Sequence, residues 1–308
     1  MRYSVLLSYN GAAFRGWQRQ ADAPSVQEEL ERAISTLTGV QTGVTGAGRT
    51  DTAVNAIGYV ASFEAREGLD TPDFCYKLNA ILPSGICVHG LRREAADFNA
   101  RFDARRREYC YFLHRSKDPF IDRYSYLYGY PELDFDLMNR VAEKLLGTHD
   151  FSCFEKSGSD NKTSVCTVFE AGWHRYTPTH VALMGAGSAN SPAPLPPRTG
   201  PAQKTSAGEP ADACATPAAA YIGTGPGHGE YWYFRIAADR FLRNMVRAVV
   251  GTLLEVGRGK RSAEDFAGLI LPPDPLSGAA PGTSRPVRRS LAGESVPGHA
   301  LFLSRIEY

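Results

Sequence analysis

Asp51 is the residue of this sequence that is best placed to do chemistry. It follows Arg49 and Thr50 in the stretch GAGRTDTAVNAIGYVASF at 46–63, where three small residues lead into the charged pair. Glycine-rich backbone directly before charged side chains is typical of a functional loop. A nearby cation favours an ionised carboxylate, and a positioned carboxylate can act as a nucleophile without a metal or cofactor. A surface turn with an ordinary Asp–Arg pair fits the same residues, so the loop alone leaves both interpretations open.

A second group of charged residues lies in the segment RFLRNMVRAVVG at 240–251. Arg243 and Arg247 are four residues apart, so a helix would place both on one face. A charge on an otherwise apolar helix is costly without a partner, and Arg247 therefore favours a nearby carboxylate such as Asp51. An arginine at the solvent-exposed margin of the helix is the alternative.

Arginine and tyrosine residues are combined in a third stretch, FNARFDARRREYCYF at 98–112. On a strand, Tyr109 and Tyr111 share one face and Cys110 lies on the other. The arginines could hold phosphates, and an exposed tyrosine ring could stack on a base. A half-buried strand with a basic edge explains the same pattern without any function.

Several common kinds of site are absent from the sequence. The approach to Asp51 has no Gly-Lys-Ser/Thr, and Gly46-x-Gly48 lacks a third glycine at dinucleotide spacing. The six cysteines form no CxxC pair and the seven histidines form no HExxH cluster. We therefore expect buried free thiols and no metal site.

Composition and charge are those of an ordinary soluble protein, with 43% hydrophobic and 22% charged residues among 308. No apolar run reaches membrane-spanning length and the start of the chain lacks a signal-peptide layout, so a cytoplasmic location without membrane contact is expected. The net charge of +1 neither supports nor excludes binding to nucleic acid. The arginines are nevertheless clustered, at 101–107, 240–247, 258–261 and 285–289. Such clusters fit either a groove that binds nucleic-acid phosphates or a set of solvated faces.

Hydrophobic periodicity predicts an α+β fold with a mixed sheet. The first half is expected to form a strand, helix, strand, helix and strand at 2–9, 26–37, 59–63, 73–81 and 86–91. In the second half, strands are expected at 107–113, 165–173, 181–184, 230–237 and 300–306, and helices at 134–145, at 239–256 and from Ser262. We divide the chain into domains at 1–106 and 107–308, with an insertion of unassigned role, rich in Ala, Pro, Gly and Ser, at 185–229.

Together these stretches resemble the tRNA pseudouridine synthase A family. The GRTD and FLRNMVRAVVG segments are its signatures, and the resemblance covers nearly the whole chain outside residues 185–229 and 272–287. Further matches are YNGAAFRGWQRQ, LNAILPSGICV, FNARFDARRREYCY and AGESVPGHALFL.

The resemblance implies two α/β domains with largely antiparallel sheets and a positively charged cleft between them. It implies that Asp51 is the catalytic nucleophile and that Arg247 pairs with it. Tyr109 corresponds to the tyrosine that stacks on the target base, and Arg49 to the arginine that helps to open the RNA stack. The family converts uridine to pseudouridine in the anticodon stem-loop of tRNA, as a homodimer and without a cofactor.

Three residues after Asp51 depart from the family pattern GRTDAGVHA, because Thr52, Ala53 and Asn55 replace Ala, Gly and His. Alanine resists the positive φ that a glycine often adopts in such a turn, and asparagine keeps hydrogen bonding but has no titratable ring. An active enzyme with lowered activity or altered site choice is expected. The alternatives are a non-catalytic relative that binds and folds tRNA and, disfavoured by the lack of a cofactor motif, a small-molecule enzyme.

Overall fold

The computed structural model describes the chain apart from residues 131, 157, 159–162, 186–229 and 273–288. The insertion expected at 185–229 lies outside the described residues except for its first residue. Ten strands of the described chain form one sheet, with the order β4-β1-β3-β10-β5-β9-β8-β7 and with β2 beside β3 and β6 beside β5. They are β1 (Arg2–Tyr9), β2 (Val44–Gly46), β3 (Asn55–Glu64), β4 (Ile86–Arg93), β5 (Arg106–His114), β6 (Tyr126–Leu127), β7 (Gly147–Asp150), β8 (Val165–Tyr176), β9 (Tyr231–Ala238) and β10 (Leu301–Glu307).

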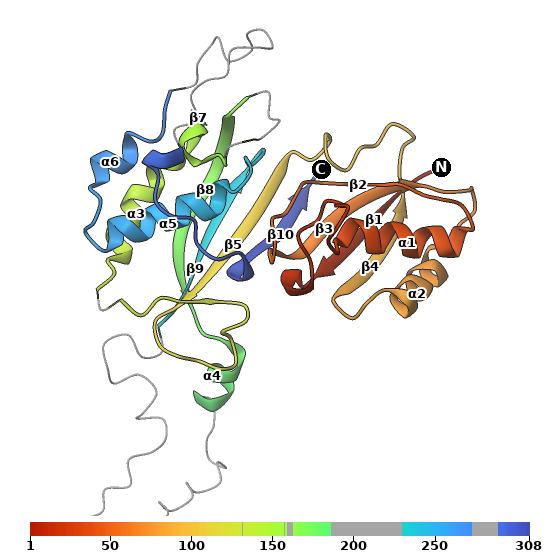
Figure 1. Ribbon diagram of the computed structural model, residues 1–308, viewed down its shortest axis with the longest axis horizontal. Helices are drawn as coiled ribbons and strands as arrows, with labels where there is room; N and C mark the ends of the chain where they lie inside the picture. Colours follow the sequence, from red (N-terminus) through yellow and green to blue (C-terminus); the bar gives the residue numbers. More distant parts are fainter. Residues whose placement is uncertain (131, 157, 159–162, 186–229, 273–288) are drawn as a thin grey trace, which may run out of the picture.

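The last strand of the chain, β10, connects the two halves of the sheet. It lies between β3 and β5, as Figure 1 shows. Its pairing with β3 is parallel and short, with Phe302 opposite Asn55 and Leu303 opposite Ala56, whereas its pairing with β5 is antiparallel. Only the pairs β10–β3 and β5–β6 of the described sheet are parallel. The predicted α+β fold with a mixed, mostly antiparallel sheet is confirmed.

Two groups of helices pack against this sheet (Figure 1). Helices α1 and α2 lie over the end formed by β1, β3 and β4, while α3, α5 and α6 lie over the end formed by β5, β9 and β8. The α-helices are α1 (Val26–Thr38), α2 (Thr71–Ile81), α3 (Phe135–Ala142), α4 (Thr179–Gly185), α5 (Met245–Gly257) and α6 (Ala263–Ala267). The short 3-10 helices are η1 (Gly11–Ala13), η2 (Glu143–Leu145), η3 (Ser152–Phe154), η5 (Arg289–Leu291) and η6 (Gly298–Ala300).

The ends of α1 follow from its flanking residues, as the sequence predicts. The Ser25 hydroxyl accepts a hydrogen bond from the Glu28 N–H at 3.3 Å, which satisfies one free donor of the first turn. Gly39 closes the helix with φ 71°, a left-handed conformation that glycine adopts at little cost. The buried face then consists of Val26, Leu30, Ala33 and Ile34.

The strand expected at 59–63 is longer, because β3 starts at Asn55, and two other expected elements differ more strongly. The helix expected at 239–256 starts only at Met245, because Asn244 is left-handed at φ 67° and the Asp239 carboxylate accepts from the Thr167 N–H instead of starting a helix. The strand expected at 181–184 is part of helix α4, whose first turn is closed by a bond from the Ala182 N–H to the Pro178 carbonyl.

The thiols of the described chain are free, but they are not all buried as predicted. Cys153 and Cys166 are buried, and burial raises the pKa of the Cys166 thiol to about 12. Cys87 is exposed, because it lies on the outer side of β4. Cys214 is outside the described residues. Among the described helices, none is long and apolar enough to cross a membrane.

Candidate active site

The loop that carries Asp51 is held in place by the segment that follows β1. The Tyr9 and Thr50 hydroxyls are hydrogen bonded at 2.8 Å, and the Thr50 carbonyl accepts from the Trp17 N–H at 3.2 Å. Gly16 has φ +102°, and a Cβ there would come within 2.4 Å of the Thr50 carbonyl oxygen. Glycine is required at Gly16 by both conformation and space, so Asp51 follows a backbone segment that is fixed on this side.

The residues before Arg49 are fixed by buried aromatic rings. The Tyr59 hydroxyl donates to the Gly48 carbonyl, and the Gly48 N–H lies 3.4 Å from the same hydroxyl oxygen. Trp17 stacks on Tyr59 with 4.1 Å between ring centres. Burial raises the pKa of Tyr59 well above its ordinary value, so this hydroxyl stays protonated and can donate.

Two arginines from the region of α5 reach the Asp51 carboxylate. Arg247 Nη1 lies 3.6 Å from Asp51 Oδ2, and Arg243 Nε lies 4.0 Å from Oδ1. Arg247 is oriented by the chain before β10, since its Nε donates to the Val296 carbonyl at 2.7 Å and its own carbonyl accepts from the Val296 N–H. The Asp51 side chain is 27% exposed, which leaves it open to a ligand. The structure therefore brings together two arginines and a carboxylate that are almost 200 positions apart in the sequence.

Arg49 does not pair with Asp51, although the two residues are only two positions apart in the sequence. Its Nε donates to the Gln18 amide oxygen at 3.2 Å, and its side chain is exposed. The cations beside Asp51 are instead Arg243 and Arg247, from the α5 region. Arg49 remains available at the outer edge of the site.

Tyr109 lies near Asp51 but is less accessible than the sequence predicts. Only 8% of the residue is exposed, because Phe241 packs edge-to-face against its ring with 5.1 Å between centres. Burial raises the pKa of Tyr109 to about 12, against the influence of Arg107 and with a smaller contribution from Asp51. The phenol is therefore neutral, and because the residue is only 8% exposed, side chains packed on it, such as Phe241, would have to move for a base to stack on the ring.

Arg107 is the structural residue that the sequence reasoning missed. Its guanidinium donates five hydrogen bonds to four backbone carbonyls, those of Ala47, Arg101, Ala104 and Asp239. Burial lowers the pKa of Arg107, and the nearby tyrosines and Asp239 act in the opposite direction and raise it. It joins the approach to Asp51 with the segment that leads to α5, and it does not hold phosphate as an exposed arginine would. Nothing in the sequence distinguishes it from the arginines beside it.

The departures from the family pattern are accommodated in different ways. Ala53 has φ 63°, so the predicted positive φ is confirmed and alanine bears the strain there. Asn55 is 3% exposed and both ends of its amide are hydrogen bonded, since its Oδ1 accepts from the Gly11 N–H at 2.9 Å and its Nδ2 donates to the His299 carbonyl at 2.7 Å. It links η1 to η6 behind the active-site loop.

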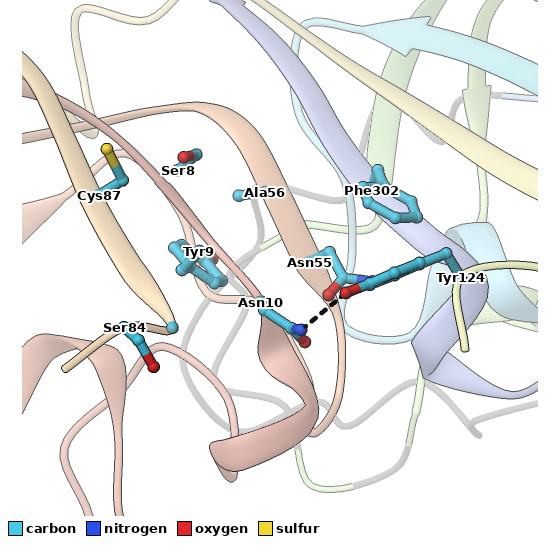
Figure 2. A pocket seen from close by; sticks show the side chains of 10 residues that line it. Ser8, Tyr9, Asn10, Asn55, Ala56, Ser84, Cys87, Tyr124 and Phe302 are labelled. Atoms are coloured by element: carbon cyan, nitrogen blue, oxygen red, sulfur yellow. Dashed lines mark hydrogen bonds between the residues drawn. The ribbon is translucent and has the colours of Figure 1, made fainter. Parts of the chain in front are cut away.

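A hollow of about 290 Å³ lies behind this loop (Figure 2). It shares Tyr9 and Asn55 with the supports of the loop, and a hydrogen bond of 3.2 Å from Asn10 Nδ2 to the Tyr124 hydroxyl crosses it. Asp51 is not among the residues that line it. This hollow is therefore separate from the carboxylate with its two arginines.

Comparison with known proteins identifies similar sequences over the whole chain. The family model described as tRNA pseudouridine synthase matches residues 141–308. The chain is 37% identical to tRNA pseudouridine synthase A of Bacteroides thetaiotaomicron, covering 100% of this chain and 90% of the relative. It is 38% identical to the protein of the same name from Porphyromonas gingivalis, with 100% and 97% covered, and 32% identical to that of Acetivibrio thermocellus, with 99% and 98% covered.

Proposed function

The chain belongs to the tRNA pseudouridine synthase A family, and we propose that it isomerises uridine to pseudouridine in the anticodon stem-loop of tRNA. The observation that carries the proposal is the Asp51 carboxylate, which ends a tightly held loop and lies beside Arg247 and Arg243. Ionised carboxylates of this kind serve as nucleophiles or bases in the absence of a metal.

The proposed reaction moves the uracil ring on its ribose. The bond between N1 and C1′ breaks, the free ring rotates, a bond forms between C5 and C1′, and the C5 proton is released while N1 ends protonated. Asp51 assists either by attacking C1′ or by removing a sugar proton, and both routes require it to be ionised. Arg247 lies 3.6 Å from the carboxylate and, because its own Nε is bonded to the Val296 carbonyl, it holds the carboxylate in one orientation.

The remaining predicted residues act on the RNA in this proposal. The target base must leave its stack, at a cost of a few kcal/mol. Arg49 is exposed at the outer edge of the site, where a guanidinium can enter the space that the base leaves. Tyr109 would contact the rotated uracil once Phe241 has moved from its ring.

We propose two further properties from the resemblance. The boundary between residues 106 and 107 separates an N-terminal domain that carries the active-site loop from a C-terminal domain, with a positively charged cleft between them. The active molecule is a homodimer. Sedimentation equilibrium of the full chain at micromolar concentration tests the second property, and a monomer that remains fully active would contradict it.

The test of the function uses purified protein and unmodified tRNA transcripts labelled with tritium at uracil C5. The wild-type chain is expected to release tritium and to form pseudouridine, which chemical mapping locates in the anticodon stem-loop. Asp51→Asn removes the nucleophile while keeping its shape, so activity should fall roughly a thousandfold or more while tRNA binding remains. Asp136→Asn, at an exposed position in the first turn of α3, is the matched control and should stay active.

Arg247→Ala should also lose activity while the chain keeps its fold. If the wild-type protein binds tRNA and forms no pseudouridine in any transcript, the chain is a tRNA-binding relative and the catalytic role of Asp51 is wrong.

A further inference from the structure

An apolar ring is held in solvent on the loop that precedes β5. Phe102 is 77% exposed, although burying a phenylalanine side chain normally stabilises a protein by about 1.5–3 kcal/mol. The loop that presents it is well ordered by local bonds, because the Asn99 side-chain oxygen accepts from the N–H groups of Arg101 and Phe102 at 2.9 and 3.2 Å. The Asp103 carboxylate in turn accepts from the Asn99 N–H at 2.8 Å. The Phe102 ring is thus exposed on a turn whose backbone is stabilised by hydrogen bonds.

The same loop is anchored to three other parts of the molecule. The Ala100 N–H donates to the Ser62 hydroxyl of β3 at 3.4 Å, and the Ala100 carbonyl accepts from the Tyr308 hydroxyl at 2.8 Å. The Arg101 carbonyl accepts from Arg107 at 2.6 Å. Because the backbone is fixed from several sides, Phe102 can meet a ligand without the entropy cost of ordering a flexible loop.

Arg101, beside this ring, and Arg49 have no carboxylate partners among the described residues and line one hollow. The Arg101 guanidinium is 5.5 Å from the centre of the Phe102 ring. Arg101 and Arg49 line the same hollow of about 190 Å³, together with Gln18 and Gly48. Within the described part of the chain, neither arginine forms an ion pair. Two uncompensated cations around one hollow favour an anionic ligand.

The position of this hollow relates it to the reaction. Gly46, Gly48 and Arg49 line the hollow, so a ligand held there contacts the same loop that carries Asp51, although Asp51 itself does not line it. An exposed aromatic ring beside guanidinium groups is the combination that binds unpaired nucleotides, since the ring stacks on a base of any sequence and the cations hold the phosphate.

We propose that Phe102 and Arg101 form a second RNA site next to Arg49, which holds an unpaired nucleotide that flanks the target uridine. Phe102 stacks on its base, and the Arg101 guanidinium binds its phosphate. The inference rests on the proposed function for the identity of the RNA. It adds an element that positions the substrate to the residues that carry the chemistry.

The test couples a protein variant to an RNA variant. Binding of an anticodon stem-loop RNA is measured by fluorescence anisotropy for wild type and Phe102→Ala, with each loop nucleotide replaced in turn by an abasic one. Phe102→Ala should raise the Kd roughly 5- to 100-fold. At one position of the RNA loop, the abasic substitution should raise the Kd of the wild-type protein by the same factor as Phe102→Ala does. The same substitution should leave the Kd of Phe102→Ala unchanged, because this variant has already lost the stacking between ring and base.

Three further variants check the assignment. Phe102→Trp should restore binding to within about threefold, since indole also offers a ring face. Arg101→Ala should reduce the slope of log Kd against log salt by about one, the value for a single phosphate contact. Tyr76→Ala, which removes a ring that is 74% exposed on α2, is the matched control and should bind as wild type does.

An unchanged Kd for Phe102→Ala, or equal losses in wild type and variant at every abasic position, would overturn the proposal. The second result would assign Phe102 to a protein partner or to loop stability. Because the assay reads binding, a failure here is distinct from a failure of the catalytic proposal, in which stacking is intact and no pseudouridine forms.

Discussion

Replacing Arg107 with methionine should loosen the active-site loop from the two segments to which it is bound. Methionine keeps a long apolar stem but has no donors, so the Ala47, Ala104 and Asp239 carbonyls lose their partly buried hydrogen bonds. The Arg101 carbonyl loses a bond in an exposed setting, where water can replace it. The variant thus tests how much the Arg107 guanidinium contributes by connecting the residues before Asp51 with the segment that leads to α5.

The expected loss follows from counting the acceptors that water cannot easily reach. Each unsatisfied, partly buried carbonyl costs about 1 kcal/mol at the lower end of the usual range, so three of them reduce the free energy of unfolding by about 3 kcal/mol. Arg107→Lys should lose about half of that amount, because a compact ammonium keeps the charge but cannot reach all three carbonyls.

Urea unfolding of the full chain measures this loss, with Arg105→Met as the matched control. Arg105 is exposed and its side chain makes no hydrogen bond or ion pair within the residues that the structure describes. Turnover should fall in Arg107→Met, while the salt dependence of tRNA binding should match that of wild type. A free energy of unfolding within about 0.5 kcal/mol of the control, combined with a reduced salt slope, would refute the reasoning and restore Arg107 as a phosphate contact.

Three other perturbations address the loop, a buried histidine and the long helix. Ala53→Gly removes a Cβ from a left-handed residue, and urea unfolding should show a gain of about 0.5–1 kcal/mol; a loss would mean that the strain is absent. Burial lowers the pKa of His114, so the stability from its neutral form is complete above about pH 6.5 and falls as the pH drops toward the folded value; unfolding midpoints at pH 7.5 and 5.5 should differ less in His114→Gln than in wild type, and equal differences would contradict this. Gly251→Ala places a Cβ 1.8 Å from the Glu294 carbonyl oxygen and should lower the melting temperature clearly, with more than about 3 kcal/mol lost, whereas Gly43→Ala meets no atom within 4 Å and should melt as wild type does.

Local features of the fold were predictable from the sequence because their causes lie within a few residues. Ser25 and Gly39 define the ends of α1 through a side-chain cap and a left-handed closure. The strain at Ala53 was predictable for the same reason, since it depends on one residue's own backbone angle. The long helix was predicted too long because Asn244 and Asp239 are compatible with helix in sequence, and only their contacts with neighbouring segments break it.

The sequence by itself determined the α+β class, the family and the identity of the Asp51 loop, because periodicity and short motifs are local properties. Only the tertiary structure decided that Arg247 and Arg243 reach Asp51 while Arg49 turns away, and that Arg107 binds backbone carbonyls. It also decided that Asn55 meets His299, which is 244 positions later in the chain. Such contacts depend on β10, which pairs between β3 and β5 and joins the two halves of the sheet. Residues that are brought together by the closure of a long chain segment show no periodic pattern in the sequence, so local sequence patterns do not predict their contacts.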